Sequence, residues 1–248
     1  MRTILIHCFV ILFWFACSAQ AVQPEIVIGT SYSPPLSTRE DDGYFDLLLA
    51  EAFSRLGMKA RTLMLPAGRS LKDANNGHLD GEVGRVQGID QVYPSLVMVP
   101  EPVLSERRFT AFSVGMNPEI HEWEDLSPYN VGYVRGWKIF EKKSGSAKSL
   151  VPVDDTEMLF QSLKKGRIDV ALSAELDGLA MAKKLGIQDV RVLAEPLAAK
   201  KMYLYLHKRH KDLTAPLAGA LRALKEEGAV EEIRRRVSRK YIEFRPGS

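Results

Sequence analysis

The sequence predicts an α/β fold made of two similar lobes. From Glu25 onward, short runs rich in β-branched residues alternate with stretches of helical periodicity, a pattern typical of parallel sheets covered by helices. A half-polar extended segment, Arg107–Val114, separates two sets of such elements. A second extended segment near residues 200–206 leads into a helical tail without a lobe of its own. We therefore expect two lobes joined by two crossover strands.

The first set of elements ends repeatedly at residues that stop regular structure. A helix is expected to close at Gly57 and a shorter one at Asn76-Gly77, because glycine and asparagine tolerate the left-handed conformation that follows a helix. A turn is expected around Ser33-Pro34-Pro35. The predicted elements are strands at 25–30, 59–65 and 81–86 and helices at 45–56 and 69–75.

The second set repeats this plan. Asp154, with Glu157 three residues later, predicts an N-cap and capping box for a helix that ends at Gly166. The other predicted elements are strands at 130–134, 151–153, 170–172 and 190–193 and helices at 137–143 and 177–185. The tail, a strand at 202–206 and a helix at 213–227, is expected to return to the first lobe. The expected domains are 22–110 with 204–248, and 111–203.

The first 21 residues have the composition of a cleavable signal peptide. Arg2 provides a positive start, an apolar run covers Cys8–Cys17, and Ala19-Gln20-Ala21 is a small-residue cleavage site. We expect cleavage after Ala21 and a periplasmic location. A lipidated Cys17 is the alternative, although Trp14 and Phe15 precede it where a lipobox usually has Leu and a small residue. Both cysteines of the chain lie in this segment, so the remainder has no thiol and no disulfide.

Composition argues against several functions. The formal net charge is +3, whereas nucleic-acid binding needs a concentrated basic face. The basic residues at 234–240 are interpreted as a solvated helix face, because the helix dipole favours cations near a helix C-terminus. The histidines at 78, 121, 207 and 210 are too scattered to predict a metal site, and the sequence contains no nucleophile elbow or phosphate loop. We expect no metal, no cofactor and a monomer.

Five segments together resemble the bacterial extracellular solute-binding proteins of family 3, which include the polar amino-acid receptors of ABC transporters. The segments are Ile26–Thr30 with Tyr32 and Pro34, Gly43–Asp46, Gly77–Gly81, Val131–Gly136 and Gly166–Leu172. The resemblance implies a type II periplasmic-binding-protein fold with a ligand cleft between the lobes. It also implies a small-molecule ligand and an inner-membrane ABC permease or sensor kinase as partner.

The chain is more similar to a divergent subgroup of that family. This subgroup combines a Pro-x-x-Arg turn, here Pro66–Arg69, with an Asp-Gly-Glu segment and a following Arg, here Asp80–Arg85. The closing strand Tyr203–Lys208 also resembles it. Two charges that the family's amino-acid receptors use are missing: the Arg that holds the carboxylate is absent near Gln91, and the Asp that holds the ammonium is replaced by Ala174.

Six residues are therefore candidates for ligand binding. Arg85 offers a planar fork for a carboxylate or phosphate, and the alternative is an ion pair with Glu82 or Asp90. Tyr32 and Trp137 lie on predicted cleft loops, one in each lobe, where packing is the competing role. Arg69 is predicted at a helix start, where its charge opposes the helix dipole and so suggests another role, and the alternative to ligand binding is an ion pair with a nearby acid. Arg135 and Glu175 complete the set.

These features favour a binding protein that captures a small, anionic organic ligand for an ABC-type transporter or a sensor. The alternative from another class is a small-molecule enzyme on the same fold, such as a dehydratase, which would need an acid and a base in the cleft. Glu82, Glu175 and Asp155 are the carboxylates placed to serve. A third alternative is a sensory or interaction module that takes no part in transport.

Overall fold

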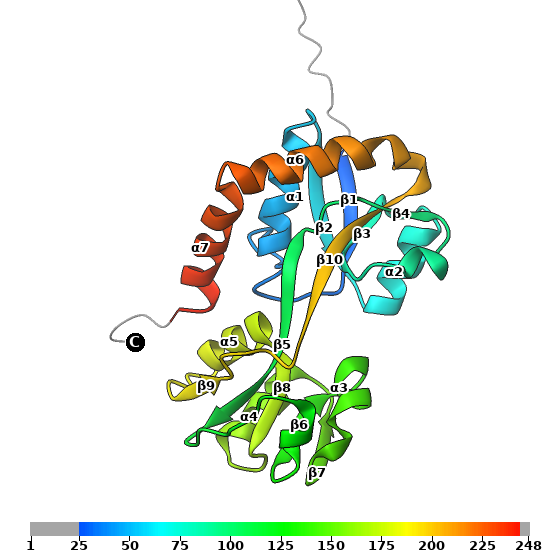
Figure 1. Cartoon of the computed structure of the whole chain (residues 1–248). Coiled ribbons are helices and arrows are strands. Elements are labelled where there is room, and N and C mark those ends of the chain that lie inside the picture. Colours follow the sequence, from blue (N-terminus) through cyan, green and yellow to red (C-terminus); the bar gives the residue numbers. More distant parts are fainter. Residues whose placement is uncertain (1–24, 244–248) are drawn as a thin grey trace, which may run out of the picture.

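The computed structural model describes residues 25–243, and the predicted signal peptide at 1–21 and its cleavage site lie outside this range. One continuous sheet runs through both lobes in the order β2-β1-β3-β10-β5-β8-β6-β7, with β4 beside β10 and β9 beside β5. Figure 1 shows an upper and a lower lobe connected by the two long strands β5 and β10. The predicted α/β class with two crossover strands is confirmed.

The upper lobe contains five strands around a parallel core. Strand β1 pairs in parallel with β2 and β3, while β10 runs antiparallel to β3 and β4. Its elements are β1 (Glu25–Thr30), α1 (Tyr44–Ser54), β2 (Lys59–Met64), α2 (Ala67–Asn75), β3 (Gly81–Arg85), β4 (Leu96–Met98), α6 (Thr214–Glu226) and α7 (Ala229–Tyr241).

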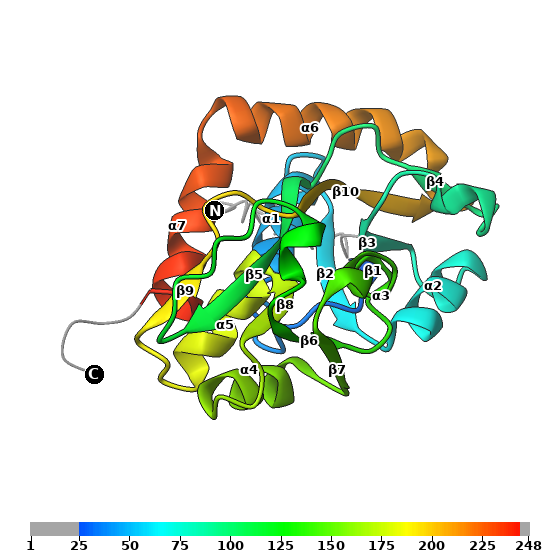
Figure 2. The same ribbon diagram turned by 60° about the horizontal axis from the view of Figure 1, so that its bottom comes forward.

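The lower lobe repeats the parallel arrangement with β6 between β7 and β8. Its elements are β6 (Asn130–Val134), α3 (Lys138–Lys143), β7 (Ser149–Val153), α4 (Thr156–Lys164), β8 (Val170–Ala174), α5 (Glu175–Lys184) and β9 (Val190–Val192). Helices α3 and α4 lie at the front of this lobe in Figure 2.

The crossover strands β5 (Leu104–Val114) and β10 (Ala198–His207) belong to both lobes. The first half of β10 pairs with β5, and its second half joins the upper sheet. Register shifts near Met202 and Leu204 let the strand turn between the two sheets. The predicted crossovers therefore coincide with real strands, although the exact domain boundaries stay a prediction.

The C-terminal tail packs on the upper lobe. Leu217, Leu221 and Leu224 of α6 are fully buried in the core cluster that also contains Phe45 and Phe53 of α1. Helix α7 then turns down the side of the molecule and lies beside α5 in both ribbon views. The basic residues near the C-terminus are on α7, where Lys240 and the Tyr241 hydroxyl bind Asp42.

One predicted cap is wrong by one residue. Asp155, not Asp154, is the N-cap of α4, and its Oδ1 accepts a 2.7 Å hydrogen bond from the Met158 amide. Glu157 therefore falls one position too early for the expected capping box. Asp154 is instead exposed and bound to Arg135. Either of two adjacent aspartates could serve as the N-cap by residue type, and the end of β7 decides which one does.

Candidate functional site

Arg107, on β5 at the junction of the lobes, is the centre of the candidate site. Its side chain is 5% exposed, and its Nη2 lies 3.0 Å from Oδ2 of Asp177 in α5. The guanidinium carbon lies 4.6 Å from the ring centre of Tyr32, 5.7 Å from that of Trp137 and 5.9 Å from that of Phe109. Nη1 is buried and has no hydrogen-bond partner among residues 25–243.

The Tyr32 ring is fixed by contacts within the upper lobe. Its hydroxyl donates a 2.7 Å hydrogen bond to the Gly84 carbonyl, and its ring packs edge-on against Phe45 at 5.4 Å. Gly84 has a φ of +81°, and a Cβ at this position would overlap the Tyr32 ring. Burial raises the pKa of Tyr32, so its hydroxyl stays protonated as a donor.

The other two rings are fixed within the lower lobe. Trp137 stacks on Phe140 with ring centres 5.6 Å apart and an interplanar angle of 8°. Phe109 meets both rings edge-on, at 6.2 Å from Trp137 and 5.9 Å from Phe140. Aromatic side chains from both lobes therefore surround one cation.

An ion pair between Glu82 and Arg85, both on β3, lies in the upper lobe. The Glu82 side chain is fully buried, and its Oε1 accepts a 2.9 Å hydrogen bond from Nε of Arg85, whose Nη2 also binds it. The other Glu82 oxygen accepts from the Ser70 hydroxyl, and Arg85 Nη2 donates to Ser31 Oγ at 3.1 Å. Burial raises the pKa of Glu82, and the Arg85 charge opposes this shift.

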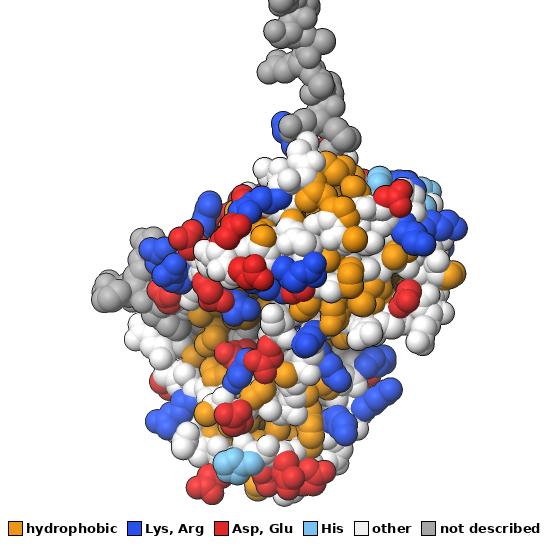
Figure 3. Space-filling model, turned by 45° about the horizontal axis from the view of Figure 1, so that its top comes forward, with side chains coloured by type: hydrophobic (Ala, Val, Ile, Leu, Met, Phe, Trp, Pro, Cys, Tyr) orange, Lys and Arg blue, Asp and Glu red, His pale blue; other side chains and the backbone are white. Residues whose placement is uncertain are grey.

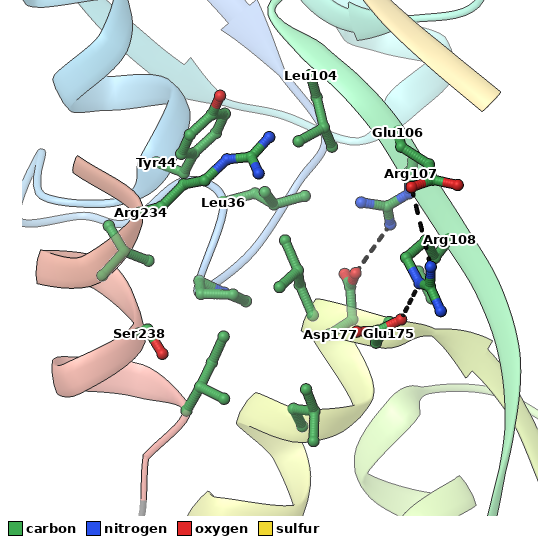
Figure 4. Close-up of a pocket in the computed structure, with 16 residues that line it drawn as sticks. Leu36, Tyr44, Leu104, Glu106, Arg107, Arg108, Glu175, Asp177, Arg234 and Ser238 are labelled. Carbon is green, nitrogen blue, oxygen red and sulfur yellow. Dashed lines mark hydrogen bonds and ion pairs between the residues drawn. The ribbon is translucent and has the colours of Figure 1, made fainter. Parts of the chain in front are cut away.

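A cavity of about 310 Å³ adjoins Arg107 and Asp177 between the lobes (Figure 4). In that view Arg107 and Asp177 are joined at one side, and Tyr44 and Arg234 lie opposite them. Arg234 of α7 lies 6.0 Å from the Tyr44 ring centre. Apolar side chains make up much of the remaining wall: Pro35, Leu36, Leu104, Ala174, Leu176, Leu179, Val237 and Ile242.

A further cavity of about 480 Å³ lies farther along the interlobe boundary. It is bounded by the Ser33-Pro34 loop on one lobe and by α5 with Thr156 of α4 on the other. Asp177 lines this cavity as well as the first. Together they provide space for a small molecule with both polar and apolar portions.

The structure brings some predicted site residues together and separates others. Tyr32 and Trp137 meet at Arg107, and Arg85 is close enough for its charge to lower the Tyr32 pKa against the effect of burial. The Arg85–Glu82 ion pair, weighed from the sequence as an alternative to ligand binding, is present. Glu175 lines the first cavity but is bound to Arg108.

Two of the predicted residues lie on the surface. Arg69 has a 71% exposed side chain and lies 3.4 Å from Asp73, one turn along α2. Arg135 has a 61% exposed side chain and binds Asp154 at 2.9 Å. Neither lines the cavities described above.

Sequence reasoning missed Arg107, Phe109 and Asp177 as site residues. Arg107 falls in the predicted crossover strand, which is assigned a connecting role and no ligand contact. The available indication was alternation, because Arg107, Phe109 and Ala111 lie on one face of an extended strand and two of them are apolar. Asp177 is on a predicted helix, but nothing local indicates a partner 70 residues away.

Each of the three carboxylates considered for catalysis is engaged by a different partner. Glu82 binds Arg85 and Ser70, Glu175 binds Arg108, and Asp155 caps α4. In residues 25–243 there is no cluster of three or more His, Cys, Asp or Glu suited to a metal ion. None of the helices described by the structure has the length and apolarity needed to cross a membrane.

No family model matches the sequence. An uncharacterized protein of Shewanella oneidensis is 28% identical over an alignment of 251 positions, gaps included, that covers 92% of each chain. Among solved structures, a histidine kinase sensor domain with similarity to periplasmic binding proteins has a TM-score of 0.69 at 19% identity, covering 88% of this chain and 96% of that one.

Two solved amino-acid receptors are similar in structure. The ABC transporter substrate-binding protein AbpA from Streptococcus pneumoniae, bound to L-arginine, has a TM-score of 0.69 at 15% identity and covers 89% of this chain and 97% of its own. An ancestral arginine-binding protein bound to arginine has a TM-score of 0.66 at 19% identity, with coverage of 88% and 98%. The chain thus has the type II periplasmic-binding-protein fold, which confirms the fold expected from the resemblance.

Proposed function

We propose that the protein is an exported solute-binding protein, not an enzyme, that captures a small anionic ligand between its lobes for an ABC-type transporter or a sensor. The fold supports this, since its structural neighbours include ABC substrate-binding proteins and a kinase sensor domain. The ligand is expected to combine an anionic group with a planar or apolar portion.

The observation that carries the proposal is the unpaired Nη1 of Arg107. A buried donor without a partner costs roughly 1–3 kcal/mol, more when charged, so a ligand acceptor there would relieve an existing penalty. Nη2 is already paired with Asp177, whereas Nη1 has no hydrogen-bond partner within the described residues. A carboxylate oxygen fits this donor, and the adjoining apolar cavity fits the rest of the ligand.

Standard α-amino acids should bind weakly. Ala174, at the position where amino-acid receptors of the family have an Asp, is 1% exposed and has no charge to offer an ammonium group. Gln91, near the missing carboxylate Arg, lies in a short 3₁₀ turn and is exposed. The carboxylate of an α-amino acid could still use Arg107, so the disfavoured group is the ammonium, and enclosing it without a partner would cost several kcal/mol.

Calorimetry on the protein without its signal peptide tests the proposal. We expect at least one organic acid from a panel of aromatic and branched carboxylates to bind, and the twenty amino acids to bind weakly. Arg107→Met, which retains most of the apolar volume, should weaken acid binding by about tenfold or more, equivalent to about 1.4 kcal/mol. Arg61→Met, which removes an arginine paired with Glu25 at the surface and outside both cavities, is the control. Tight binding of a common α-amino acid, unaffected by Arg107→Met, would contradict the proposal.

Export by the signal peptide at residues 1–21 is part of the same proposal. Sequencing of the mature N-terminus from a periplasmic fraction should find Val22 first. A chain beginning at a lipidated Cys17 would instead indicate a membrane-anchored receptor. Neighbouring genes would separate uptake from sensing, because a permease with an ATPase favours the former and a kinase the latter.

A further inference from the structure

The side chain of Arg107 lies in a compartment assembled from separate parts of the fold. Tyr32 comes from the upper lobe, Trp137 and Asp177 from the lower lobe, and Phe109 from the crossover strand itself. All three ring centres lie within 6 Å of the guanidinium carbon, a distance at which ring faces attract cations. Asp177, with an 11% exposed side chain, balances the charge.

The aromatic walls of this compartment are held by contacts other than Arg107, and the backbone of Asp177 is held within α5. Tyr32 is held by the Gly84 carbonyl and by Phe45, both in the upper lobe. Trp137 and Phe109 are held by Phe140, which is fully buried. Asp177 is in the first turn of α5, where the helix dipole favours a carboxylate. The walls should therefore remain when the arginine side chain is removed.

We propose that Tyr32, Phe109, Trp137 and Asp177 form a binding subsite for a guanidinium group, and that the chain's own Arg107 occupies it. Aromatic faces and a carboxylate together provide the chemistry that selects this planar cation, because the rings attract its charge and the carboxylate accepts its N–H groups. Arg107 is in this sense an internal ligand.

This occupancy determines the charge of the external ligand, a consequence that rests on the function proposed above. A cationic molecule cannot enter the subsite while Arg107 fills it. Such a molecule would also face the free Nη1 of the same guanidinium. The protein is thereby closed to guanidinium compounds and open to an anion.

Chemical rescue of a truncated variant tests the subsite itself. Arg107→Ala removes the side chain beyond Cβ, and N-ethylguanidinium replaces the missing atoms. Calorimetry should show this cation binding to Arg107→Ala about tenfold or more tighter than to the wild type, and it should raise the Tm of the variant. N-ethylurea, which is neutral with nearly the same shape, should have little effect.

Two further variants isolate the contributions of the walls. Arg108→Ala removes another arginine of β5, one that is bound to the Glu175 carboxylate of α5. Among the described contacts, no aromatic ring centre lies within 6 Å of the Arg108 guanidinium. N-ethylguanidinium should not rescue it. Adding Asp177→Asn to Arg107→Ala should abolish most of the rescue, because the carboxylate is lost.

The result can overturn the subsite without affecting the proposed function. Equal effects of N-ethylguanidinium and N-ethylurea on Arg107→Ala, or equal rescue of Arg108→Ala, would rule the subsite out. If Arg107→Ala does not fold alone, its refolding yield with each compound gives the same comparison, and no gain from the cation would also count against the subsite. Binding of organic acids to the wild type is measured separately and tests only the proposed function.

Discussion

The charges of Arg85 and Arg107 both act on Tyr32, but the two arginines are bound differently. Arg85 is committed to Glu82 through Nε and Nη2, with Ser31 as an additional partner. Arg107 uses Nη2 for Asp177 and leaves Nη1 unpaired within residues 25–243. The first arginine therefore stabilises a buried acid, whereas the second has a donor available to a ligand. Arg85 is predicted as a ligand contact, but it could bind a ligand only through N–H groups that Glu82 and Ser31 do not use.

Truncating Arg85 should destabilise the protein in a pH-dependent way. Breaking a buried pair leaves an uncompensated charge on Glu82, which costs about 3–5 kcal/mol. Burial already raises the pKa of Glu82, and the loss of Arg85 raises it further. A carboxyl group whose pKa is higher in the folded than in the unfolded state stabilises the fold below its unfolded pKa, and this stabilisation is lost as the pH rises through the folded pKa. The loss of unfolding free energy in Arg85→Ala relative to wild type should therefore be largest at neutral pH and shrink toward pH 4.

Urea unfolding of wild type and Arg85→Ala across this pH range measures the deficit. Adding Glu82→Gln to Arg85→Ala should remove most of its pH dependence. Arg61→Ala breaks an ion pair with Glu25 whose side chains are 44% and 54% exposed, and it should cost less than about 1 kcal/mol. A deficit for Arg85→Ala that is constant with pH would refute the role assigned to Glu82.

At the scale of elements, helix α4 shows how a local pattern can be displaced by the neighbouring strand. Strand β7 extends through Val153, and the Arg135 amide donates to the Val153 carbonyl at 2.9 Å. This places Asp154 beside Arg135 and leaves Asp155 to begin the helix. The cap is therefore determined by where the strand ends.

The two aspartates form a natural test of this assignment. Asp155→Ala should lower the free energy of unfolding by about 0.5–2 kcal/mol, because the Met158 amide loses its side-chain acceptor. Asp154→Ala breaks only a pair whose side chains are 61% and 72% exposed, and it should change stability by less than about 1 kcal/mol. Chemical denaturation compares them directly, and a reversed order would refute the assignment of Asp155 as the cap.

At the scale of the whole molecule, α7 connects the tail of the upper lobe to the lower lobe. Lys183 of α5 donates to the Arg239 and Lys240 carbonyls at 3.2 and 2.9 Å, near the end of α7. A cation there also complements the helix dipole.

Elsewhere the surface is mixed, with basic and acidic side chains interspersed on the face drawn in Figure 3.

Removing this contact should favour separation of the lobes. The lobes are joined by two strands and are expected to close on a ligand. Lys183→Met should therefore increase the radius of gyration of the free protein in small-angle scattering, and a bound organic acid should reduce it again. Lys164→Met is the control, since Lys164 donates at 2.8 Å to Leu185 within one lobe. A radius unaffected by both the variant and the ligand would argue against lobe closure.

Much of the architecture was determined by the sequence alone. Alternating β-branched and amphipathic runs report on neighbouring residues, and their order predicted the α/β class, both crossover strands and the return of the tail. Positions of Tyr32 and Trp137 on loops that follow strands could also be predicted, because strand ends lie along one edge of each lobe.

Only the tertiary structure decided which charges meet. Arg107 and Asp177 are 70 residues apart, and Arg108 and Glu175 are 67 apart. Local periodicity contains no information about such pairs, since their separation depends on how β8 and α5 pack against β5. The ring cluster, the interlobe cavities and the unpaired Nη1 all result from that packing. The sequence therefore specified the two lobes, while long-range packing specified the chemistry between them.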